Sequence, residues 1–246
     1  MLLFPLAGAA AALMLDRVRH KFRDMALRLF TVLELAMSVC LFVLIWNGQK
    51  EIAWSLPGAC GLGLTFRADG FRALYALLAC FMWAMAAQLS MEYFAGHGHH
   101  LGRYAFFTLI TECGVVGVFL SDDLYTAFVF FEIMSIASYP WVAHEETSGA
   151  LRASATYLGV SIACGMVTLM GMFLCWRETG DLSFAGLRAH ANESALVLPA
   201  CLMLVGYCAK AGMAPCTSGC PRPIQWRRRR PARCCPVCSP KRACSA

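Results

Sequence analysis

Residues 125–141 read YTAFVFFEIMSIASYPW, and this stretch decides the fold. It is apolar over nearly the length of a membrane-crossing helix, and no alternation of period two marks it as a strand. Its one charged residue, Glu132, lies near the middle among large apolar neighbours. A charge at the centre of a span costs roughly 2.5–3.5 kcal/mol on insertion scales, so only a partner or water inside a helix bundle can satisfy it.

The composition of the whole chain indicates a membrane protein. Of its 246 residues, 59% are hydrophobic and 15% are charged, whereas a soluble domain carries about 25% charged residues. Seven apolar blocks can be drawn: Met1–Leu15, Ala26–Trp46, Phe71–Phe94, Tyr104–Leu120, Leu124–Val142, Ser154–Trp176 and Ala195–Pro215. We therefore predict an all-α membrane fold, a polytopic bundle of about seven transmembrane helices. The short first block reads as a retained span, a signal peptide or a fragment of a longer span, and the lack of basic residues before it favours the retained span.

Basic residues predict the orientation of the chain in the membrane. The densest basic cluster before the C-terminal tail consists of Arg17, Arg19, Lys21 and Arg23. The positive-inside rule places this loop, residues 16–27, in the cytoplasm. The N-terminus is then expected outside, as are segment Asn47–Gly70 and the acidic turn Ser121–Asp123.

A polar stripe accompanies Glu132 along its helix. Ser135 follows by three residues and Tyr139 by seven, so all three side chains share one helical face. Such a stripe suits a hydrogen-bonded path for protons or water. The competing interpretation is an interhelical clasp with no role in transport.

Lys210 is the second ionisable residue in an apolar block that suggests function. A lysine near the end of an apolar run could extend its amino group to the membrane interface. Gly206, Gly212 and Pro215 surround it, however, and all three weaken helical continuity. Discontinuous helices beside an intramembrane charge are typical of ion sites, which favours a lysine that takes up and releases protons.

Other polar groups within the apolar blocks are weaker candidates. Glu34 and Glu112 are both expected to face the bundle as polar contacts between helices, and Glu112 is a possible member of the proton path. A loop holds His97, His99 and His100 between glycines. A metal site there is the alternative to a solvated loop, and the solvated loop is favoured.

The last 31 residues, 216–246, differ in composition from the rest. They contain six of the 14 cysteines and eight of the 21 basic residues, and no acidic residue. The remaining 13 basic and 15 acidic residues give residues 1–215 a net charge of −2, so the net charge of +6 belongs to the tail and predicts no nucleic-acid partner for the chain. Zinc ligation by its cysteines and an anionic-lipid patch at Arg227–Arg230 are the alternatives to a disordered segment without function.

Three stretches resemble the antiporter-like membrane subunits of respiratory complex I, which recur in membrane-bound hydrogenases and multi-subunit cation/proton antiporters. Phe66–Arg72 (FRADGFR) is similar to the beginning of that family's third helix. Phe130–Tyr139 (FFEIMSIASY) resembles its glutamate-bearing fifth helix, and Lys210–Pro215 (KAGMAP) its lysine-bearing broken seventh helix. The resemblance covers residues 1–215, about the N-terminal half of a 14-helix subunit.

The resemblance implies roles for two residues and a setting for the chain. Lys210 corresponds to the lysine that passes protons along a polar axis, and Glu132 to the glutamate that modulates it. The implied function is proton or Na⁺ translocation within an NADH:quinone oxidoreductase- or hydrogenase-like complex, beside other membrane subunits in the lipid bilayer. No cofactor and no redox catalysis are expected in this subunit. The alternatives are a subunit of a multi-subunit antiporter, a non-transporting structural subunit and a carrier for a small organic substrate.

The sequence departs from the family directly after Pro215. The family continues with a Leu-His-x-Trp-Leu-Pro-like stretch, whereas this chain reads Cys-Thr-Ser-Gly-Cys-Pro at 216–221. The bases C-TGC-ACG-TCT-GGC-TGC-CC encode the observed residues, and shifted by one base they encode Leu-His-Val-Trp-Leu-Pro. We therefore predict that residues 216–246 arise from a frameshift. Resequencing the gene is expected to find the shift near codon 216; the same 31 residues encoded in frame by close relatives would contradict it.

Overall fold

The computed structural model describes residues 1–16, 20–48, 51–58, 61–94, 101–144, 146–190 and 194–210. Each apolar block of the sequence overlaps one α-helix. These are α1 (Leu3–Asp16), α2 (His20–Trp46), α3 (Gly70–Tyr93), α4 (Leu101–Leu120), α5 (Leu124–Val142), α6 (Ser148–Thr179) and α8 (Val197–Lys210). Helices α2 and α6 begin before their predicted blocks, at His20 and Ser148. A short helix α7 (Phe184–Ala189) and a 3₁₀ turn η1 (Ser194–Leu196) join α6 to α8. The predicted helical membrane fold is confirmed.

Among the described residues, four helices are long and apolar enough to cross a membrane. They include Phe22–Trp46 in α2, Gly70–Ser90 in α3, all of α4 and all of α6. The described parts of α1 and α8 have 14 residues each, about 21 Å at 1.5 Å per residue, which is shorter than the roughly 30 Å hydrocarbon core. Helix α5 has 19 residues and carries Glu132 within its apolar run.

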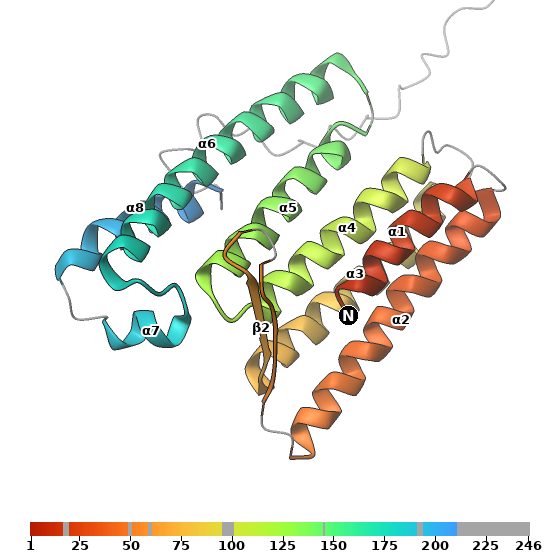
Figure 1. Cartoon of the computed structure of the whole chain (residues 1–246). Coiled ribbons are helices and arrows are strands. Elements are labelled where there is room, and N and C mark those ends of the chain that lie inside the picture. Colours follow the sequence, from red (N-terminus) through yellow and green to blue (C-terminus); the bar gives the residue numbers. More distant parts are fainter. Residues whose placement is uncertain are drawn as a thin grey trace, which may run out of the picture.

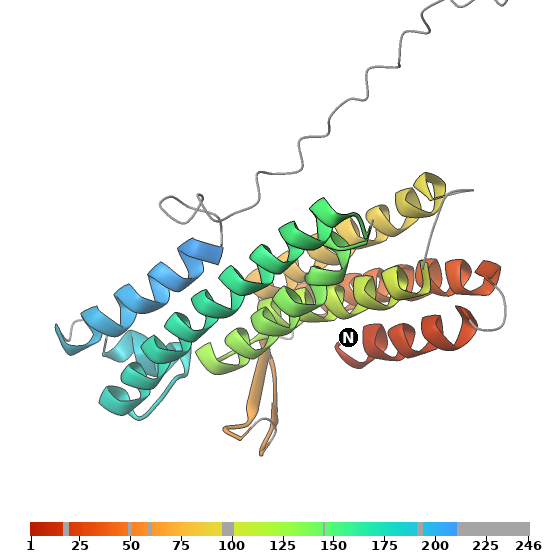
Figure 2. The same cartoon turned by 90° about the horizontal axis from the view of Figure 1, so that it is seen from above.

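Most of the helices form a row with α4 near its centre. Figure 1 shows α8, α6, α5, α4, α1 and α2 in this order, each packed against the next. Helix α3 packs on α2 and α4, on the side away from α1 (Figure 2). Glycines allow some of these close approaches: a Cβ atom at Gly117 of α4 would lie 2.2 Å from the Phe130 ring of α5. Small residues at contacts are typical of helices packed within a membrane.

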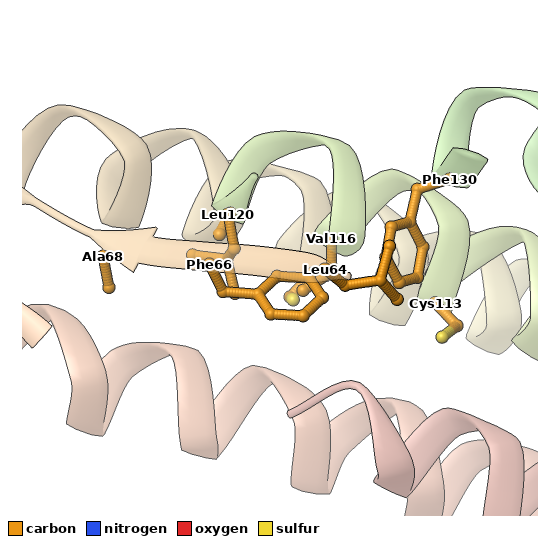
Figure 3. Close-up of a cluster of buried hydrophobic side chains, with 9 residues drawn as sticks. Leu64, Phe66, Ala68, Cys113, Val116, Leu120 and Phe130 are labelled. Carbon is orange, nitrogen blue, oxygen red and sulfur yellow. The ribbon is translucent and has the colours of Figure 1, made fainter. Parts of the chain in front are cut away.

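A pair of β-strands connects α2 to α3 in the sequence and forms a β-hairpin. This hairpin was not predicted from the sequence. Strands β1 (Ile52–Leu56) and β2 (Leu64–Ala68) pair antiparallel, with Ile52 opposite Ala68 and Leu56 opposite Leu64. The hairpin projects from the row of helices in Figure 2. Alternate side chains of β2 enter a buried apolar cluster with α4 and α5 (Figure 3), where the Phe66 and Phe130 ring centroids lie 5.6 Å apart.

Polar contacts join this hairpin to the acidic turn before α5. The Asp122 carboxylate forms ion pairs with the guanidinium groups of Arg67, at 3.1 Å, and Arg72, at 3.0 Å. The Thr65 hydroxyl donates a hydrogen bond to the Asp123 carboxylate at 2.6 Å. Asp123 also caps α5 by accepting the Thr126 backbone N–H. The two segments that the sequence analysis placed on one side of the membrane therefore lie at the same end of the bundle.

Several predictions concern residues outside the described part of the chain. They are the histidine loop at 97–100, the break expected in the helix after Lys210, and the tail 216–246 with its zinc, lipid-patch and frameshift interpretations.

Candidate functional site

Glu132 and Lys210 meet between α5 and α8. The Lys210 ammonium group donates a hydrogen bond to Glu132 Oε1, and Ser135 Oγ lies 3.5 Å from the same nitrogen. The Lys210 side chain is 5% exposed and that of Glu132 is 22% exposed. The structure thus brings together three of the five residues chosen from the sequence, across a separation of 78 positions.

Helix α6 makes this meeting possible because it presents small residues to both partners. A Cβ atom at Gly165 would lie 2.5 Å from Glu132 Oε1. One turn further on, Thr168 packs against Gly206 of α8, where a Cβ atom would lie 2.1 Å from Thr168 Oγ1. The carboxyl group therefore lies directly against the backbone of α6, and α8 approaches α6 closely enough for its lysine to reach α5.

An aromatic ring completes the surroundings of the ammonium group. Lys210 Nζ lies 4.8 Å from the centroid of the Phe131 ring, within the range of a cation–π interaction. Tyr207, one turn before Lys210, packs edge-on against Phe131 at 5.5 Å. The sequence analysis missed Phe131 because an aromatic residue in a membrane helix is ordinarily a packing residue.

The polar stripe of α5 continues in a direction that the sequence analysis did not identify. The Ser138 hydroxyl lies 2.8 Å from the Tyr157 hydroxyl of α6 and 2.8 Å from the Ser135 carbonyl oxygen. The Tyr139 hydroxyl makes no hydrogen bond to another residue in the part of the chain that the structure describes, so its place on a proton path stays a prediction. The polar residues of α5 recur every three positions, at 132, 135 and 138, and the last of them contacts Tyr157 of α6.

Glu34 of α2 and Glu112 of α4 lie apart from this ion pair. They are 0% and 1% exposed, and they face the bundle as expected. None of their four carboxyl oxygens has a hydrogen-bond partner among the described residues. The expected polar contact between helices is therefore absent at these carboxyl groups. The helices that carry them, α2 and α4, pack on each other.

The sequence matches a known protein family over the region that contains helices α5 to α8. The family described as "NADH:quinone oxidoreductase/Mrp antiporter, TM" matches residues 121–221, a range that contains both Glu132 and Lys210. Proteins of Staphylococcus aureus strains JH9 and Newman that carry the name antiporter subunit mnhD2 are each 29% identical to this chain over 167 residues. The chain is homologous to antiporter-like membrane subunits. The resemblance inferred from the sequence motifs is confirmed.

Solved structures show the same fold. A chain of the membrane-bound sulfane sulfur reductase, an archaeal respiratory membrane complex, aligns with a TM-score of 0.76 at 23% identity. A chain of the Mrp complex from Dietzia sp. DQ12-45-1b aligns at 0.74 and 23%, and one of respiratory complex I from Thermus thermophilus at 0.67 and 20%. Each alignment covers 89% of this chain.

The antiporter-like relatives are much longer than the region that they share with this chain. The alignments cover 32% of the two Staphylococcus proteins. They cover 45%, 42% and 45% of the three solved chains, respectively. The matched region therefore corresponds to less than half of a complete antiporter-like subunit.

Proposed function

We propose that this chain takes part in translocating protons or Na⁺ across a membrane, with Lys210 as the group that carries the proton and Glu132 as the group that modulates it. The observation that carries the proposal is the buried ion pair between α5 and α8. At low dielectric the attraction between two opposite charges depends strongly on their separation. Movement of the Glu132 carboxylate toward or away from the ammonium group therefore changes how firmly Lys210 holds its proton.

Ser135, Ser138 and Tyr157 supply a route to this lysine. Hydroxyl groups both donate and accept hydrogen bonds, so a chain of them conducts protons by exchange. Ser135 Oγ lies 3.5 Å from Lys210 Nζ, and the Ser138 and Tyr157 hydroxyls lie 2.8 Å apart. The Ser135 and Ser138 hydroxyls each donate to a backbone carbonyl, of Phe131 and Ser135 respectively, so proton transfer along this route requires these two hydroxyls to rotate. Glu112 and Tyr139 remain possible members of the path as the sequence analysis named them.

Glu132→Gln tests the proposed role of the carboxylate. It preserves the shape of the side chain and removes its charge, so we expect coupled ion transport to fall at least about tenfold, which corresponds to about 1.4 kcal/mol. The measurement is ion flux in vesicles that hold the complex assembled with the frame-restored chain. Glu178→Gln, at the exposed end of α6, is the matched control and is expected to transport normally. Wild-type flux in the Glu132→Gln variant would contradict the proposal.

The partners that we propose are other membrane subunits and the surrounding lipid. The similar solved chains come from multi-subunit membrane complexes. We favour an NADH:quinone oxidoreductase- or hydrogenase-like host, and a multi-subunit cation/proton antiporter is the alternative. Neighbouring genes separate them: genes for iron–sulfur subunits indicate the first host, and a series of small membrane subunits indicates the second.

We also propose that the N-terminus faces outward and that segment 16–27 is cytoplasmic. The sequence analysis expected this segment to be a loop, but α2 begins at His20, so its second part is helical. The basic cluster of this segment supports the orientation, and the hairpin and the acidic turn lie together at one end of the bundle. An N-terminal epitope tag is expected to bind an impermeant antibody on intact cells. Antibody binding only after permeabilisation would show that the N-terminus is cytoplasmic and would contradict the proposed orientation.

A further inference from the structure

Glu34 and Glu112 place two acidic groups inside the α1–α4 part of the bundle, where no described residue forms a hydrogen bond with either carboxyl group. Both side chains are almost completely excluded from solvent, and all four carboxyl oxygens lack a hydrogen-bond partner among the described residues. A buried polar group without a partner costs several kcal/mol, and an isolated charge costs more. A carboxyl group in such a place either holds a proton or binds another cation, and the two helices that carry these groups, α2 and α4, pack on each other.

The neighbouring hydroxyl groups offer oxygen lone pairs and no free hydrogens. Thr31 and Ser38 lie one turn before and after Glu34 on α2, and their hydroxyls donate to the carbonyls of Leu27 at 3.0 Å and Leu35 at 2.8 Å. On α4 the Thr108 hydroxyl, one turn before Glu112, donates to the Tyr104 carbonyl at 2.7 Å. These hydrogens are used within their own helices, so the three hydroxyl groups offer the carboxyl pair acceptors rather than donors.

The titratable and charged groups around the pair come from each helix that packs on it. Cys80 of α3 and Cys113 of α4 both interact electrostatically with the two glutamates. The α-amino group of Met1, which precedes α1, acts on Glu34 and on Cys113. The Cys113 thiol lies 3.3 Å from the Leu2 carbonyl oxygen, to which it donates.

We propose that Glu34 and Glu112 form a binding site for one monovalent cation, a proton or Na⁺, separate from the Glu132–Lys210 pair. Two acidic side chains with further oxygen lone pairs beside them have the chemistry that binds a small hard cation. The proposal extends the proposed function, because it supplies a second position for an ion inside the same subunit. The site itself is defined by Glu34 and Glu112 alone, and it does not require that Lys210 carry protons.

Infrared difference spectroscopy of the purified 246-residue chain in lipid nanodiscs tests the site by its carboxyl bands. One arm changes the pH in a choline medium, and the other replaces choline by Na⁺ at constant pH. We expect a carboxyl difference signal in the pH arm, and a Na⁺-induced signal as well if the site accepts Na⁺. Glu34→Gln and Glu112→Gln are each expected to remove at least about half of the signal. They should also shift the titration of the remaining carboxyl by roughly one pH unit, because coupled groups titrate together.

The controls separate this site from the proposed transport function. Glu51→Gln, at an exposed position beside Arg67, and Lys210→Met are both expected to leave the Glu34–Glu112 signal in place. If a Gln variant fails to fold, Glu112→Met provides an apolar side chain of similar size and is expected to lose the same signal. An unchanged spectrum in the folded Glu34 and Glu112 variants, or no response to pH and Na⁺ in the wild-type chain, would overturn the proposal even if Lys210→Met abolishes transport.

Discussion

Lys210→Met is expected to reduce ion translocation to the background rate. Methionine is similar in length to lysine but carries no exchangeable proton and no charge, so the proposed proton-carrying group and its cation–π contact with Phe131 are both lost. Glu132 is left without its partner in a mostly buried position. Removing one member of a buried ion pair costs about 3–5 kcal/mol, so the variant is expected to unfold more readily as well. The measurement is proton or Na⁺ flux in vesicles, with thermal unfolding recorded in parallel.

Arg177→Met is the control for this substitution. Arg177 lies in the last turn of α6, where its side chain is 72% exposed and pairs with Glu178. An exposed ion pair contributes about 0–1 kcal/mol, so flux and stability are expected to stay near their wild-type values. Equal losses of flux in Lys210→Met and Arg177→Met would show that the effect is not specific to the α5–α8 pair.

Gly165→Ala is expected to have the second-largest effect, although it adds one methyl group and changes no charge. The new Cβ atom would lie 2.5 Å from Glu132 Oε1, so the carboxyl group must move away from α6. The end of a glutamate side chain is flexible, so stability is expected to change little while the carboxylate is displaced. Because the position of the carboxylate sets the proton affinity of Lys210 in our account, flux is expected to fall several-fold or more in the same vesicle assay.

A second glycine of α6 provides a matched control. Gly159 has open space where a Cβ atom would be added, so Gly159→Ala meets no neighbour. Alanine is the better helix former by about 0.8–1 kcal/mol, and this variant is expected to be as stable as wild type or more so, with normal flux. If Gly165→Ala and Gly159→Ala show equal ion flux, close contact between α6 and the Glu132 carboxyl group is not required for transport, which would contradict this prediction.

The fold and the central pair could be predicted from the sequence because membrane burial leaves strong signals. Apolar runs gave the seven long helices, and a charge within such a run needs a partner. The resemblance to the antiporter-like subunits linked Glu132 with Lys210, and the structure places the two in contact although 78 positions separate them. The hairpin could not be predicted in the same way, because β1 is exposed along its whole length and shows no alternation of burial.

The surroundings of the pair could not be predicted because they depend on how three helices pack. Gly165 resembles any small residue of a membrane helix until α5 is placed against it. Ser138 and Tyr157 meet only because α5 and α6 align at that height. For Glu34 and Glu112 the sequence correctly predicted burial, but polar contact was assumed from residue type, and the packed helices provide no hydrogen-bond partner.

The central claim is that the Glu132–Lys210 pair moves ions rather than only holding helices together. A double-mutant cycle with Glu132→Gln, Lys210→Met and both changes together tests it most directly, with ion flux and unfolding free energy measured on each variant. We predict that the double variant regains most of the stability lost in Lys210→Met, because no unpaired charge remains, and that it still transports at the background rate. A double variant that regains both stability and wild-type flux would show that the pair is only a structural contact, and would contradict the account.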